Sequence, residues 1–186
     1  MFILQGVELG AVTGGKAVLS DLSLKLVRTY KGEINRTQTG MIATFPNSFV
    51  TVGFDFKFLG SRSVLRTVEQ IFLSADKVEL AFDFDGTSLK GEFSCTANAV
   101  TELHAKDDKQ VELTISVVSD GSNITDASGN AFHVKDANDT VATLEDPCYF
   151  GKVYKLKPAY LAYKLDGYTL PDGKILVLGN HTLTAP

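Results

Sequence analysis

The stretch VTVGFDFKF, residues 50–58, places an apolar side chain at every second position and a small or polar one between. Successive side chains of a β-strand point to opposite faces, so this alternation predicts a strand with one buried and one wet face. A parallel strand covered on both faces would be continuously apolar. The stretch therefore favours an antiparallel sheet.

The same period of two recurs on both sides of this stretch, and one helical pattern interrupts it. Further alternating strands are expected at Leu22–Tyr30, Val78–Phe84, Leu89–Thr96 and Val111–Val118. From Val64 to Leu73 the apolar residues follow a spacing of three and four, which predicts an amphipathic helix, with Ser61 or Ser63 as its cap. The predicted fold is mostly β: an antiparallel β-sandwich with one short α-helix and a β-rich C-terminal extension.

Composition changes after about residue 119. Residues 120–139 are rich in Asp, Asn, Ser and Gly, and five of the six tyrosines follow them: Tyr149, Tyr154, Tyr160, Tyr163 and Tyr168. We therefore expect residues 1–118 to form the sandwich with its helix, and residues 119–186 to form a β-rich extension or arm. The alternative is a single larger sandwich with one long loop.

Charge and composition disfavour several classes of partner. The 186 residues include 18 basic and 22 acidic ones, for a net charge of −4, whereas nucleic-acid binding needs clustered positive charge. No stretch reaches the ~18 apolar residues of a membrane helix. The start, Met1–Gln5, has no signal-peptide pattern, because it lacks a basic region and a long apolar core. Cys95 is expected to be a buried free thiol, and whether it meets Cys148 stays open.

The stretch DFDGT, residues 83–87, resembles the first motif of haloacid-dehalogenase-type phosphatases. The resemblance implies Asp83 as nucleophile, Asp85 as acid/base and a magnesium ion, with Asp107-Asp108 as the distal metal-binding pair. That motif ends a parallel strand buried on both faces, in a fold of alternating strands and helices. Here the strand alternates and a second strand follows, so Asp85-Gly86 is better explained as a hairpin turn.

Other residues capable of chemistry give no better site. His104, His133 and His181 show no metal-ligand spacing with one another or with cysteine. The C-terminal tyrosines are compatible with a carbohydrate- or receptor-binding surface, but the chain has no Trp and tyrosine is also common at protein interfaces. The sequence thus predicts no enzyme, with no catalytic residue, cofactor or metal. A carbohydrate-binding sandwich and a magnesium phosphatase stay as alternatives.

The order of elements resembles the N-terminal domain of distal-tail, baseplate-hub proteins of long-tailed bacteriophages. Leu26–Tyr30, Thr39–Pro46, the alternating strand to Phe58, the helix from Val64 and the hairpin after it carry the resemblance, which covers about half of the chain. It implies a structural subunit of a phage tail or baseplate, forming a ring, hexameric by analogy, and docking neighbouring tail proteins. It also implies a virion component, made in the host cytoplasm, without catalytic residues.

Overall fold

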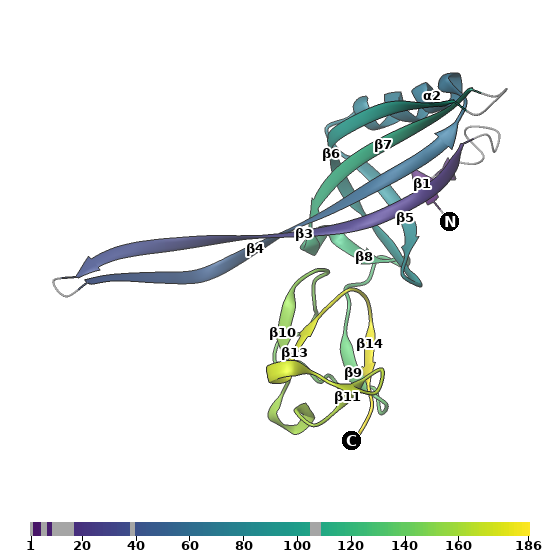
Figure 1. Ribbon diagram of the computed structural model, residues 1–186. Coiled ribbons are helices and arrows are strands. Elements are labelled where there is room, and N and C mark those ends of the chain that lie inside the picture. The colour runs from purple at the N-terminus through teal and green to yellow at the C-terminus, as the bar shows by residue number, and fades with distance from the viewer. Residues whose placement is uncertain (1, 5–6, 9–16, 38–39, 105–108) are drawn as a thin grey trace.

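The computed structural model describes residues 2–4, 7–8, 17–37, 40–104 and 109–186, with the backbone alone at 7–8, 28–37, 40–50, 101–104 and 109–110. One antiparallel eight-stranded sheet dominates it, in the order β2-β1-β5-β6-β7-β4-β3, with β8 beside β6 (Figure 1). Its strands are β1 (Phe2–Leu4), β2 (Val7–Glu8), β3 (Val18–Thr37), β4 (Gly40–Gly60), β5 (Val78–Phe84), β6 (Thr87–His104), β7 (Lys109–Asp120) and β8 (Ile124–Asp126).

The predicted mostly β fold with one helix is confirmed in the described part of the chain. Each of the five expected strands is present as β3, β4, β5, β6 or β7, and β5 has the predicted bounds. The others extend further than their alternation indicated. No helix among the described residues is long and apolar enough to cross a membrane.

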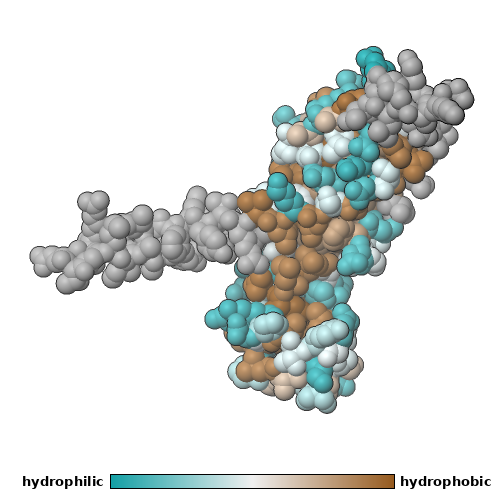
Figure 2. All heavy atoms as spheres, viewed as in Figure 1, coloured by the Kyte–Doolittle hydropathy of each residue, from teal (hydrophilic) through white to brown (hydrophobic). Residues whose placement is uncertain are grey.

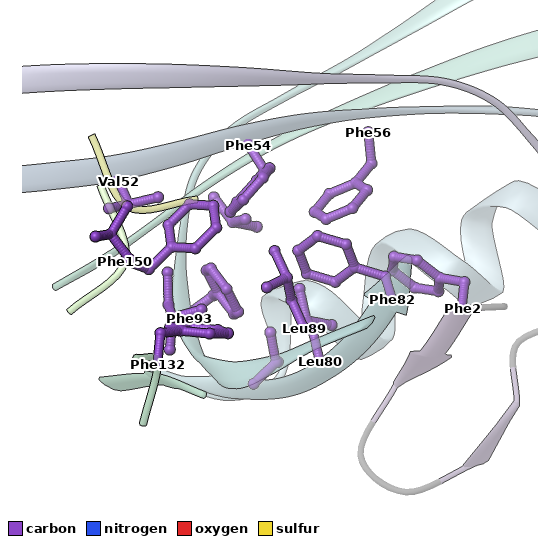
Figure 3. Packing of buried hydrophobic residues seen from close by; sticks show 14 of the residues in the cluster. Phe2, Val52, Phe54, Phe56, Leu80, Phe82, Leu89, Phe93, Phe132 and Phe150 are labelled. Carbon is purple, nitrogen blue, oxygen red and sulfur yellow. The ribbon is translucent and has the colours of Figure 1, made fainter. Parts of the chain in front are cut away.

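The sheet curls so that strands from its two ends face each other across the core. The rings of Phe2 on β1 and Phe56 on β4 have centroids 5.0 Å apart, and those of Phe54 and Phe82 are 4.9 Å apart, all edge to face (Figure 3). Such aromatic pairs add to the apolar area that they bury. The core therefore lies inside one curled sheet, and the predicted sandwich of two sheets is not confirmed among the described strands.

The helix α2 (Arg62–Leu73) packs against β7 and β4 and covers part of the core. Leu65, Val68 and Phe72 are its buried residues, which is the face that the spacing predicted. Ser61 is the N-cap residue, which was one of the two positions expected. Its hydroxyl makes no capping hydrogen bond and lies 3.2 Å from the Ser63 hydroxyl. Apolar burial therefore holds this helix in place.

The C-terminal region, residues 121–186, consists of short strands and 3₁₀ turns. Its elements are η1 (Gly121–Asn123), β9 (Val134–Asp136), β10 (Val153–Lys155), η2 (Pro158–Tyr160), β11 (Lys164–Leu165), β12 (Tyr168–Thr169), η3 (Pro171–Gly173), β13 (Lys174–Leu176) and β14 (His181–Leu183). The Phe150 ring lies 6.1 Å from Phe54 of the sheet and 6.0 Å from Phe132, which joins this region to the main core (Figure 3). The division of the chain near residue 119 stays a prediction.

The feature that projects from the molecule is the far end of the β3–β4 hairpin (Figure 1). Here the arm denotes its backbone from the Arg28↔Val50 pair to the Thr37↔Gly40 pair. At about 3.4 Å per residue the arm is about 30 Å long. The register shifts between Lys31 and Glu33, opposite Phe45 and Pro46. Proline lacks the N–H that a ladder requires, so such a bulge is where proline fits in a strand.

Candidate functional site

The phosphatase-like stretch forms a hairpin turn, as predicted. Phe84 pairs with Thr87, and the two residues between them have positive φ, 46° at Asp85 and 76° at Gly86. Positive φ at both central residues is the mark of a type I′ turn, which matches the twist of the flanking strands. Asp83 accepts a 2.6 Å hydrogen bond from the Ser88 hydroxyl across the pair. The two carboxylates therefore lie on an exposed antiparallel hairpin; Asp107 and Asp108 lie outside the described residues.

The two histidines whose side chains are described have different partners. His133 Nδ1 lies 2.8 Å from Asp146 Oδ1, and His181 Nε2 accepts the Leu178 N–H at 3.3 Å, while burial lowers the pKa of His181. The His104 side chain lies outside the described part. No three His, Cys, Asp or Glu side chains of the described residues gather as metal ligands would.

Both cysteines are free thiols. Cys148 is buried, and burial raises its pKa. Cys95 was expected to be buried and is only partly so, because it lies at the bulge between Cys95 and Ala97, where β6 changes its register with β7. A bulge bends the strand and re-aims side chains.

The C-terminal tyrosines do not form one exposed surface. The buried Tyr154 hydroxyl accepts the Tyr149 N–H at 2.8 Å, and burial raises the pKa of Tyr154 to about 12. The buried Tyr160 donates to Asp136 Oδ2 at 3.0 Å. Only Tyr149 and Tyr168 are strongly exposed, at 41% and 79%. Most of the tyrosine content is therefore used for packing.

A groove with a volume of about 620 Å³ lies where the C-terminal region meets the sheet. We call it the junction groove. Thr51 of β4, Ser94 of β6 and Asp120 at the end of β7 line one side, and residues 149–152 line the other, with Tyr149 exposed. Nothing in the sequence marks this groove, because its two sides are distant in the chain.

The sheet has a free edge along β3. This strand ends the sheet order, so one of its edges has no partner among the described strands. Leu22, Leu24 and Leu26 pair with core residues of β4 and hence share the core face, but they are only partly buried. Figure 2 shows apolar side chains gathered over the middle of the molecule, beside the base of the arm. Free strand edges next to apolar surface are sites for pairing with another chain.

The arm continues this edge beyond the body of the molecule. Its two strands pair only with each other within the described residues. An isolated two-stranded ribbon is marginally stable in water at best, and stability needs a third strand or a packed face. The arm and the β3 edge together are therefore the part of this structure that most requires a partner.

Comparison with known proteins yields structural likeness alone. No family model matches the chain, and no curated protein matches it. Among solved structures, a chain in the tail of an empty gene transfer agent particle with C6 symmetry aligns over 60% of this chain and 83% of that one, at 12% identity and a TM-score of 0.41.

A second solved structure belongs to the same kind of particle. A chain of the virion of a native gene transfer agent aligns over 55% of this chain and 80% of that one, at 11% identity and a TM-score of 0.38. TM-scores this low establish neither a shared fold nor a shared function.

Proposed function

We propose that this chain is a structural subunit of a phage-like tail or baseplate, which forms a ring by self-association and docks neighbouring tail proteins. One observation carries the proposal: the unpaired edge of β3 runs without interruption by another strand from the body into an unsupported arm. A partner strand on that edge would satisfy backbone hydrogen-bonding groups and cover the partly buried leucines.

A second copy of the chain is the partner that the charges favour. By sequence, residues 28–50 carry three basic residues and one acidic one, a net charge of +2. The whole chain carries −4, so the rest carries −6. A basic arm and an acidic remainder attract each other between copies and steer their encounter.

The two edges of the sheet favour a head-to-tail contact. One edge is β3, Val18–Thr37, and the other is β2, Val7–Glu8, so they differ greatly in length. Contacts between unlike surfaces close into rings when the rotation between subunits permits it. The resemblance to baseplate-hub proteins supports six subunits, and this number is part of the proposal.

The test is the mass in solution of the chain and of an arm-deleted variant, by light scattering after size-exclusion chromatography over a range of concentrations. In the variant, an Asn-Gly turn joins Arg28 to Val50, which already pair across the hairpin. We expect the unaltered chain to reach one discrete oligomer and the variant to stay a monomer with the same helix and core.

A matched substitution separates the β3 edge from general surface effects. Leu22→Lys places a charge among the partly buried leucines of β3, whereas Thr114→Lys places it on the outer face of the central strand β7. Charges on edge strands block pairing with other chains. Leu22→Lys should weaken association and Thr114→Lys should not. An unaltered chain that stays monomeric throughout, or an arm-deleted one that still assembles, would contradict the proposal.

A further inference from the structure

The junction groove is built on rigid backbone. Its floor is the wet face of the sheet, where Thr51 pairs with Asp120 and Ser94 pairs with Val118 across neighbouring strands. Beside it, the Ser119 hydroxyl donates to the Glu92 carbonyl at 2.6 Å. Side chains on paired strands hold their positions better than side chains on loops. The groove is therefore formed before any ligand enters.

The opposite side is equally fixed. The Tyr149 N–H donates to the buried Tyr154 hydroxyl at 2.8 Å, which anchors the backbone below the exposed Tyr149 ring. Between the two sides, a Cβ on Gly121 would lie 2.1 Å from the Phe150 carbonyl oxygen, so the two segments are in direct contact there. The volume of about 620 Å³ falls in the range of small-molecule sites, roughly 300–1,000 Å³.

The charges that border the groove are balanced. Lys77 Nζ lies 3.9 Å from Glu92 Oε2, and Lys152 Nζ lies 3.4 Å from Glu145 Oε2. Phosphate groups need cations that are free to form strong charged hydrogen bonds. Paired lysines next to the carboxylate of Asp120 make a nucleotide or another phosphorylated ligand a poor fit.

What the groove offers is hydroxyls, paired charges and one aromatic face. Thr51, Ser94 and Ser122 contribute hydroxyl groups that both donate and accept hydrogen bonds. The exposed Tyr149 ring has an apolar face and a polar tip. A ligand complementary to this set has many hydroxyls, no net charge and a flat apolar face of C–H groups.

We propose that the junction groove binds a neutral saccharide, with a sugar ring against Tyr149 and its hydroxyls hydrogen-bonded to Thr51 and Ser94. This site is distinct from the β3 edge and the arm, and its occupation would hold the C-terminal region against the sheet. Tyr168, although more exposed than Tyr149, does not line the groove and makes no such site.

Saturation-transfer NMR on the full chain tests this with free disaccharides at millimolar concentration: cellobiose, lactose, maltose and N,N′-diacetylchitobiose. At least one should receive saturation from the protein. Tyr149→Ala should weaken that binding about tenfold, as expected for loss of an aromatic contact, while Tyr149→Phe should retain most of it. Tyr168→Ala is the matched control and should bind as the unaltered chain does.

Ser94→Ala provides a second variant that leaves the Tyr149 segment intact, and it should also weaken binding. Absence of transfer to all four disaccharides overturns the proposal, and so does equal binding by the unaltered chain, Tyr149→Ala and Ser94→Ala. Light scattering on the same samples keeps the two proposals apart, because Tyr149→Ala should leave the oligomer mass unchanged.

Discussion

The arm and the C-terminal region are both β-structured, but they are stabilised in opposite ways. The arm has long strands that pair only with each other, within the described residues. The C-terminal region has strands of two or three residues, yet buried aromatic side chains such as Phe132, Phe150 and Tyr154 anchor it. Strand length therefore says little about where the free energy of folding resides.

Aspartate side chains close two turns of the C-terminal region. Asp126 Oδ1 accepts the N–H groups of Ser128 and Asn130 at 2.9 and 2.8 Å, and Asp136 Oδ1 accepts those of Asn138 and Thr140 at 2.9 Å each. The bond from the N–H of Asn130 lowers the pKa of Asp126, and that from Thr140 lowers the pKa of Asp136. Two such closed turns fix the C-terminal chain locally, whereas we expect the arm to gain its stability from assembly.

Phe150→Ala should have the largest effect on the free energy of unfolding. It removes a fully buried ring from between Phe54 and Phe132, and truncation of a buried phenylalanine costs roughly 3–5 kcal/mol. Chemical denaturation measures it. Leu144→Ala, at a leucine that is 60% exposed in the same region, is the control and should stay within about 0.5 kcal/mol of the unaltered chain. Similar losses of unfolding free energy in Phe150→Ala and Leu144→Ala would mean that Phe150 does not join the C-terminal region to the sheet.

Gly121→Ala should have the next largest effect. The added Cβ would meet the Phe150 carbonyl oxygen at 2.1 Å, so the backbone of one segment must move. Overpacking of this kind typically costs about 1–3 kcal/mol. The adjacent Ser122→Ala changes an exposed side chain and should leave the midpoint of thermal unfolding nearly unchanged. A neutral Gly121→Ala would show that the contact with residue 150 is loose.

Gly129→Ala should lower the free energy of unfolding by about 1 kcal/mol, because φ is 85° at this position and alanine disfavours that backbone conformation. The space around the site is open, so the added Cβ makes no clash. The chain provides its own comparison: Asp139 occupies the corresponding position of the second turn at φ 66°. Gly129→Asp should therefore cost less than Gly129→Ala in thermal unfolding, since aspartate tolerates this conformation better. The reverse order would refute the equivalence of the two turns.

Deletion of the arm should have the smallest effect on the monomer. With Arg28 joined to Val50 by Asn-Gly, the free energy of unfolding should change by no more than about 0.5 kcal/mol, since the strands of the arm pair only with each other within the described residues. Denaturation at a concentration where both chains are monomeric measures it. A large loss would show that the arm stabilises the body directly.

The sequence predicted the elements whose signal is local. Alternation at residues 50–58 and the spacing from Val64 to Leu73 place β4 and α2, because burial of one face depends only on period. Asp85-Gly86 predicted its turn because this pair adopts positive φ readily.

Features that depend on pairing between distant segments escaped prediction. The strand expected to end at Tyr30 continues to Thr37 because β4 pairs with it that far. The junction groove needs Thr51 and Tyr149 to meet, and no pattern near either residue indicates it. The exposure of Cys95 depends on a bulge that arises from its register with β7.

A final consequence follows from the irregularities along β3. Its pairing with β4 slips at Ser20, between Leu19 and Asp21, and again between Lys31 and Glu33. From Asp21 to Lys31 the ladder runs without a shift, and a shorter regular segment follows from Glu33 to Thr37. A strand added along this edge would have to change its register at each of the two interruptions. The same two interruptions would limit uncontrolled stacking of copies into fibrils, which requires long, flat and regular edges.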